Sequence, residues 1–161
     1  MALTIASLPV GRGTLALSPM PGRGASYAAD LADLLALGPA LVLSMTTTEE
    51  LAARGAGSLP ADLARHGIAW HPLPIGDFGV PGPDVTAIWP GVSAQVLQVL
   101  AGGGRVLVHC MGGCGRSGMA VLRLMVEAGE QPPAALARLR AVRPCAVETD
   151  AQYEWAANPP P

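Results

Sequence analysis

One stretch of the chain, residues 105–127, limits the possible folds more than any other. It begins with an apolar run at 105–108 that is typical of a short buried strand. It ends with a helical period of apolar residues at 119–127. Between the two, residues 110–116 contain three glycines, two cysteines and one arginine. The sequence therefore predicts a strand, a glycine-rich loop and a helix N-terminus in direct succession.

The residues of this loop suit the binding of a dianion such as phosphate. Glycines allow a loop to turn several backbone N–H groups inward, and the first turn of a helix adds unpaired N–H donors. The guanidinium of Arg116 can hold two phosphate oxygens at once. Positive surroundings also favour the thiolate form of a cysteine, so Cys110 is predicted to be a nucleophile beneath a bound phosphoryl group.

His109, Cys110, Gly113, Arg116 and Ser117 occur in the pattern H-C-x-x-G-x-x-R-S. This pattern resembles the signature of the cysteine-dependent protein tyrosine phosphatases, and among them the dual-specificity phosphatases of the kinase-associated type. The resemblance implies that Cys110 attacks phosphorus, that Ser117 donates a hydrogen bond to the departing thiolate, and that His109 supports the cysteine backbone. The phosphate-binding groups that it implies are the N–H donors of Met111, Gly112, Gly113, Cys114, Gly115 and Arg116, together with the Arg116 guanidinium.

The proline- and glycine-rich loop at 72–84 is the second informative stretch, because it follows a predicted strand at 68–71. Departure of an alkoxide or phenoxide needs a proton from a general acid, and this loop offers two carboxylates. Asp77, in Ile-Gly-Asp-Phe-Gly, resembles the aspartate on the mobile acid loop of the phosphatases. Asp84 stands before a helical run and fits an N-cap. Asp77 is the predicted acid and Asp84 is the alternative.

Two further segments resemble the same family. Pro-Gly-Arg at 21–23 is a pattern that phosphatases of the kinase-associated type often carry, so Arg23 is either part of the site or a solvated turn residue. Residues 143–152 resemble the family pattern Arg-Pro-x-x-Ile-Glu-Thr-x-x-Gln, with valine in place of isoleucine. The resemblance implies that Gln152 positions the water that hydrolyses a cysteinyl phosphate. The alternative is a glutamine on the surface of a helix.

The predicted strands and helices alternate along the chain, which indicates the α/β class. We expect a single three-layer domain of the protein tyrosine phosphatase type. Its sheet would be mostly parallel, with four or five strands and helices on both faces. Residues 1–157 are predicted to form this domain, and the proline-rich residues 158–161 a frayed tail. In open sheets of this class, ligands bind at the carboxyl ends of the strands.

Charge and composition exclude several classes of partner. All ten basic residues are arginines scattered along the chain and the net charge is −2, so neither nucleic acid nor a membrane is an expected partner. No apolar run reaches the length of a bilayer span, and no signal peptide is recognisable. Cysteines and histidines lack metal-binding spacing, so no metal or cofactor is expected. Thiolate chemistry indicates a reducing cytoplasm, and the oligomeric state stays open.

The predicted function is a phosphoprotein phosphatase that acts through a cysteinyl-phosphate intermediate. Phosphotyrosine is the first expected substrate, with phosphoserine and phosphothreonine also possible. The variable loop positions carry no charge, which disfavours inositides with several phosphates. Two alternatives stay open: a catalytically silent phosphopeptide-binding module, and a phosphatase of a small non-protein phosphomonoester.

The remaining cysteines allow a separate hypothesis. Cys114 lies four residues after Cys110, so oxidation could join the two sulfurs and protect the nucleophile. The alternative is that Cys114 is a small apolar filler of the loop. Cys145 is expected to pack as a free thiol.

Overall fold

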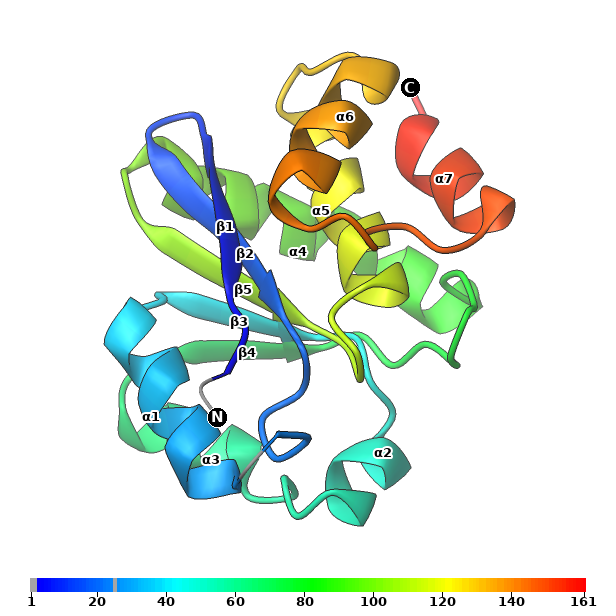
Figure 1. The fold of residues 1–161 in the computed structure, drawn as a ribbon. Helices are drawn as coiled ribbons and strands as arrows, with labels where there is room; N and C mark the ends of the chain where they lie inside the picture. The colour runs from blue at the N-terminus through cyan, green and yellow to red at the C-terminus, as the bar shows by residue number, and fades with distance from the viewer. Residues whose placement is uncertain (1–2, 25) are drawn as a thin grey trace.

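A five-stranded sheet with the strand order β1-β2-β5-β3-β4 forms the middle layer of the protein (Figure 1). The computed structural model describes residues 3–24 and 26–161. The strands are β1 (Ala6–Val10), β2 (Gly13–Ser18), β3 (Leu41–Ser44), β4 (Ala69–Pro72) and β5 (Arg105–His109). β1 and β2 form an antiparallel hairpin at one edge, and every other pairing is parallel. The predicted mostly parallel sheet is confirmed.

β5 lies at the centre of the sheet, between β2 and β3. Val106 pairs with Leu15 on one side and with Leu41 on the other. Val106, Leu107 and Val108 are all fully buried. A strand that is buried on both faces is expected to have consecutive apolar residues, and these three residues follow one another in the sequence. The residue that follows β5, Cys110, therefore emerges at the middle of the sheet edge.

Helices cover both faces of the sheet, as predicted (Figure 1). On one face lie α1 (Tyr27–Leu37), α2 (Thr48–Ala53) and α3 (Leu59–Arg65). On the other face lie α4 (Pro83–Ala101), α5 (Gly115–Glu127), α6 (Pro132–Val142) and α7 (Asp150–Ala157). Among residues 3–24 and 26–161, no helix is both long and apolar enough to cross a membrane.

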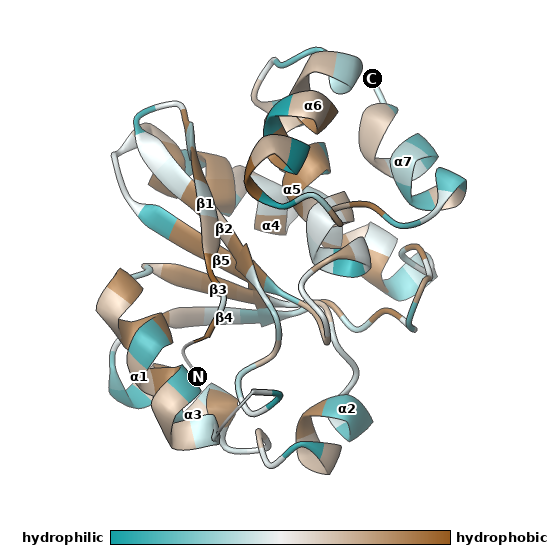
Figure 2. Cartoon of the chain, viewed as in Figure 1, coloured by the Kyte–Doolittle hydropathy of each residue, from teal (hydrophilic) through white to brown (hydrophobic). Residues whose placement is uncertain are grey.

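The two cores are built mainly from leucine, valine and methionine, because aromatic residues make up only 4% of the chain. Figure 2 shows the apolar residues concentrated on the central strands and on helix surfaces that face them. The larger core includes an edge-to-face pair, Trp89 and Trp155, with ring centroids 5.2 Å apart. The guanidinium of Arg123 lies 4.2 Å above the Trp155 ring, so α7 is fastened to α5 by a cation–π contact.

Several predicted boundaries change. α4 begins at Pro83 and continues through Pro90, and its N-cap is Gly82. Asp84 therefore lies in the first helical turn and is not the N-cap. α5 begins at Gly115, so Arg116 belongs to the helix rather than to the loop. Residues 158–161 follow α7 without regular secondary structure.

Candidate active site

Loops from four parallel strands meet at one edge of the sheet. β5 leads into the cysteine loop, which we define as residues 110–115. β4 leads into the segment with Asp77, β3 leads toward Glu50 at the start of α2, and β2 leads into the turn with Arg23. Because parallel strands present their carboxyl ends on the same side, residues distant in sequence converge here.

The carbonyl oxygens of the cysteine loop are held on its outer side. The donors are the backbone N–H of Met20 for Met111, two nitrogens of Arg143 for Gly112 and Gly113, and the backbone N–H of Val147 for Cys114, at 2.9–3.1 Å. No peptide bond among the described residues is cis. In a trans peptide the N–H points away from the preceding carbonyl. The N–H groups of residues 112–115 therefore face the inner side of the loop.

Gly113 makes this loop geometry possible. Its φ is +73°, a region that other residues rarely adopt. A Cβ at this position would lie 2.5 Å from the backbone nitrogen of Pro19 and 2.6 Å from the carbonyl carbon of Ser18. The loop therefore crosses directly over the end of β2, which explains why the motif has glycine here.

Cys110 lies at the base of the cysteine loop, and only 2% of its surface is exposed. Its Sγ is 3.2 Å from the hydroxyl oxygen of Ser117, in the first turn of α5. The sequence motif placed these two side chains together, and the structure does the same. Cys110 is also the free cysteine.

His109 connects the cysteine backbone to the neighbouring strands. Its Nε2 is 2.5 Å from the Ser44 hydroxyl, which also accepts a hydrogen bond from Trp70 at 2.8 Å. Its Nδ1 is 3.3 Å from the carbonyl oxygen of Cys110. Since the Ser44 oxygen already accepts from Trp70, its own proton is free for Nε2, which leaves the Nδ1–H to face the carbonyl.

Complete burial lowers the pKa of His109 to about 4. The desolvation of a charged imidazole is the main cause, and the nearby positive charge of Arg116 acts in the same direction. His109 is therefore neutral at physiological pH. This supports the predicted structural role, in which the imidazole fixes the backbone of the cysteine.

Arg116 is held beside Cys110 by a bidentate ion pair. Its Nη1 and Nη2 donate to the two carboxylate oxygens of Glu50 at 2.7 and 2.9 Å. Nη1 also donates to the carbonyl oxygen of Ile75 at 2.8 Å, and Nη2 lies 3.5 Å from Asp77. Among the described residues, the buried Nε has no partner. One guanidinium thus joins α2, the cysteine loop and the segment after β4.

The charges of the site stabilise one another. Burial works against the charge of Arg116, but the hydrogen bonds of Glu50 and the nearby acidic groups outweigh it and raise the arginine pKa. The hydrogen bonds from Arg116 lower the pKa of the Glu50 carboxyl. The pair is therefore ionised at neutral pH.

Asp77 lies at the tip of a turn that reaches the site. Its carboxylate accepts a hydrogen bond from the backbone N–H of Phe78 at 3.0 Å and is 60% exposed. Phe78 adopts a left-handed φ of 60° and exposes 58% of its surface, an unusual conformation for a bulky residue. Asp77 and Phe78 line the same cavity as Cys110, whereas Asp84 does not. The structure therefore brings Asp77, and not Asp84, to the cysteine.

This cavity has a volume of about 360 Å³. It is lined by Arg23, Asp77, Phe78, Cys110, Met111, Gly112, Cys114, Gly115 and Glu148. Arg23 is exposed, and its guanidinium lies over the position where a Cβ of Gly112 would be, at 2.7 Å. Of the two alternatives for Arg23, its position at the cavity favours a part in the site.

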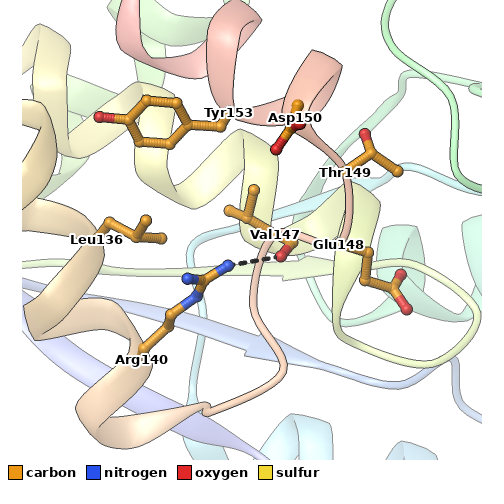
Figure 3. A pocket seen from close by; sticks show the side chains of 7 residues that line it. All are labelled: Leu136, Arg140, Val147, Glu148, Thr149, Asp150 and Tyr153. Carbon is orange, nitrogen blue, oxygen red and sulfur yellow. Dashed lines mark hydrogen bonds between the residues drawn. The ribbon is translucent and has the colours of Figure 1, made fainter.

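A separate cavity of about 260 Å³ lies between α6 and the start of α7 (Figure 3). Its one basic side chain, Arg140, donates to the backbone carbonyls of Ala146 and Val147 at 2.9 and 2.8 Å. Figure 3 shows the carboxylate of Glu148 directed away from Tyr153. Arg140 thus holds the chain before α7 in place, and Glu148 lines both this cavity and that of Cys110.

Both hypotheses for Cys114, and the expectation for Cys145, are wrong. Cys114 forms a disulfide with Cys145, with the two Cα atoms 5.2 Å apart. Cys110 and Cys114 are close in sequence, but the sulfur of Cys114 turns toward the segment after α6, where Arg143 also lies. Adjacency along a tight loop does not fix the direction of a side chain. The disulfide fastens the cysteine loop to the segment that leads into α7.

Gln152 is not on the surface of its helix, which rules out that alternative. It is fully buried in the capping box of α7, with Thr149 as the N-cap. Its side chain accepts from the N–H groups of Glu148 and Thr149 and donates to the carbonyl of Gly79. The amide therefore belongs to the framework that joins α7 to the segment of Asp77.

Three residues of the site were missed by the sequence analysis. They are Glu50, Ser44 and Arg143, and the last of these entered only as part of a family pattern. Glu50 lies six residues after the end of β3, and a carboxylate in the segment after a buried strand was the available signal for it. Within the described ranges, no group of three or more histidine, cysteine, aspartate or glutamate side chains is arranged to hold a metal ion.

A mostly parallel sheet with a Cys-x5-Arg loop between its central strand and a helix defines the protein tyrosine phosphatase class of domain. Within that class the match is specific. The profile described as "Swiss Army Knife protein, DSP-PTPase phosphatase domain" matches residues 20–155. The chain belongs to this family of dual-specificity-type phosphatase domains.

Individual proteins agree with this assignment. The chain is 34% identical over 93 residues to cyclin-dependent kinase inhibitor 3 of Mus musculus, which covers 56% of this chain and 43% of the mouse protein. It thus spans less than half the length of that relative. The structure of kinase-associated phosphatase (KAP) with its catalytic cysteine replaced by serine matches with a TM-score of 0.83 at 23% identity, covering 97% of this chain and 93% of the other. The active form of Tk-PTP gives a TM-score of 0.72 at 29% identity, covering 93% and 92%.

Proposed function

We propose that this domain hydrolyses phosphomonoesters through a cysteinyl-phosphate intermediate. The observation that carries the proposal is the position of Cys110, at the base of a loop whose N–H groups face inward and beside a buried arginine. Inward N–H groups and a guanidinium stabilise the negative charge on the equatorial oxygens as the phosphoryl group transfers. Family membership supports the same reaction class.

In the first step, the Cys110 thiolate forms a bond to phosphorus as the bond from phosphorus to the ester oxygen breaks. Arg116 and the loop N–H groups hold the three non-bridging oxygens. Asp77 gives its proton to the leaving oxygen, since it is the carboxyl group that shares the cavity with Cys110 from the segment after β4.

In the second step, water attacks phosphorus and the bond to sulfur breaks. Asp77, now ionised, takes a proton from the water. The hydroxyl of Ser117, 3.2 Å from Sγ, donates a hydrogen bond to the departing thiolate. The products are inorganic phosphate and the free enzyme.

The substrate class follows from the walls of the cavity. Phe78 presents an exposed aromatic ring at the rim, and the loop positions between Cys110 and Arg116 carry no charge. An aromatic rim stacks on a phenyl ring better than on an alkyl chain. We therefore assign phosphoproteins as substrates, with phosphotyrosine preferred over phosphoserine and phosphothreonine.

The test is turnover of a generic aryl phosphate by the chain and by Cys110→Ser. We expect no turnover by the variant and retained binding of a phosphate analogue such as tungstate. Cys145→Ser in reducing buffer is the matched cysteine control and should remain active. Full activity of Cys110→Ser would defeat the mechanism. A panel of phosphotyrosine, phosphoserine and phosphothreonine peptides with a phosphoinositide then decides the substrate class.

A further inference from the structure

The buried amide of Gln152 links the N-terminus of α7 to the segment of Asp77. Its Oε1 accepts from the backbone N–H groups of Glu148 and Thr149 at 2.9 and 3.3 Å. Its Nε2 donates to the carbonyl oxygen of Gly79 at 3.2 Å. A glutamine amide has two acceptor and two donor positions. These contacts use one of the two N–H groups of the amide.

The acceptor, Gly79, closes the turn that carries Asp77. We name residues 76–79 the acid turn, because the N–H of Gly79 donates to the carbonyl of Gly76 at 2.9 Å. Two different side chains bind the backbone carbonyls at the residue before this turn and at its last residue. Arg116 donates to the carbonyl of Ile75 at 2.8 Å, and Gln152 donates to the carbonyl of Gly79. The acid turn is thus held from both sides.

Asp77 itself has weak anchors. Its carboxylate contacts the N–H of Phe78, its own neighbour, and lies 3.5 Å from Arg116. With 60% of its side chain exposed, the position of the carboxylate is set by the backbone of the acid turn. Whatever fixes that backbone also fixes the acid.

The segments that surround the Gln152 amide, at the start of α5 and before α7, are themselves held by close contacts. A Cβ on Gly115 would lie 3.1 Å from Nε2 of Gln152, so glycine at the first residue of α5 allows the amide its place. Arg140 binds the carbonyl of Ala146 and, as Figure 3 shows, the carbonyl of Val147, just before the cap of α7. The amide therefore connects a rigid scaffold to a turn with few other contacts.

We propose that Gln152 is a positioning residue that holds the acid turn closed over the cysteine loop, so that Asp77 reaches the leaving oxygen. The inference rests on the proposed function, and it assigns the amide to proton donation in the first step rather than to the hydrolytic water. Loss of the Gly79 contact lets the acid turn move outward. Substrates that need a proton on the leaving group then slow, whereas those with strongly acidic phenols do not.

The experiment measures kcat/KM for a series of aryl phosphates, from highly acidic phenols to unsubstituted phenol. Gln152→Glu keeps an oxygen to cap α7 but removes the donor and places a carboxylate against the Gly79 carbonyl. Gln152→Met, which preserves length and volume, is the second variant in case the first does not fold. Thr149→Ala is the control, because it weakens the same cap and leaves the amide in place.

We expect either Gln152 variant to lose about tenfold or more on phenyl phosphate and to stay within about twofold on the most acidic phenol. Asp77→Asn should give the same kind of dependence on the phenol, and adding Gln152→Glu to Asp77→Asn should cause little further loss. Equal loss on every phenol, or full additivity with Asp77→Asn, overturns the proposal. Absence of turnover by the unaltered chain would instead defeat the proposed function.

Discussion

The carboxylate of Glu50 binds both terminal nitrogens of Arg116, at 2.7 and 2.9 Å, across a separation of 66 residues. The arginine side chain is 1% exposed and the glutamate 22%. A buried guanidinium needs such a partner, because desolvation of an unpaired charge is costly. The ion pair leaves the buried Nε of Arg116 without a partner among the described residues.

The first prediction concerns this pair. Glu50→Gln removes the charge and one acceptor, so Arg116 loses its fixed orientation. We expect kcat/KM for an aryl phosphate to fall by up to about 100-fold, as small misplacements of a binding group do. Stability should fall by about 2–4 kcal/mol in denaturant unfolding, since one partner of a buried pair is lost. Glu49→Gln, an exposed neighbour in the same helix, should change neither quantity.

The second prediction concerns pH and His109. Its pKa is lowered to about 4 in the folded protein, whereas the unfolded chain binds a proton near pH 6.5. Between these values the unfolded state binds more protons, so stability falls as the pH is lowered. The expected loss is about 3 kcal/mol from pH 7 to pH 4. Unfolding free energies across this range check it.

The histidine variants separate this effect from others that act in acid. His109→Asn should remove about 3 kcal/mol of the pH dependence. His66→Asn, which changes an exposed histidine, is the matched control. An identical slope in the protein with and without His109 would contradict the assignment.

The third prediction concerns the disulfide. Cys114 and Cys145 close a loop with a sequence separation of 31. In the chain-entropy account, this lowers the entropy of the unfolded chain and raises the free energy of unfolding by about 3–4 kcal/mol. Cys145→Ser should lower the unfolding free energy by that amount in non-reducing buffer. A dithiol reductant should lower the unaltered protein to the same level and have no effect on the variant. A reductant-independent difference between them would speak against the bond.

The fourth prediction concerns the loop glycine. Gly113→Ala places a Cβ 2.5 Å from the backbone of Pro19, at a φ of +73°. We expect a loss of more than about 3 kcal/mol, from strain and from the displaced end of β2, together with loss of tungstate binding. Gly55→Ala is the matched control, because Gly55 has a similar φ of +71° with no atom within 4 Å. It should cost only about 1–2 kcal/mol.

The sequence alone determined the features that depend on local pattern. The apolar run before Cys110 and the alternation of strands and helices were enough to predict the sheet and its layers. Buried strands and amphipathic helices each give a recognisable pattern of apolar residues in the sequence. The spacing of Cys110, Arg116 and Ser117 also carried over, since one strand, one loop and one helix fix their relative positions.

The tertiary structure decided the contacts between segments that are distant in sequence. The pairing of Glu50 with Arg116, the disulfide of Cys114 with Cys145 and the hydrogen bond from Gln152 to Gly79 join residues 66, 31 and 73 positions apart. Local pattern does not encode which side chains meet at the sheet edge, because that depends on strand order and on the direction in which each loop turns. For this reason the sequence alone predicted the cysteine loop, and only the fold revealed the contacts that hold the loop and its arginine in place.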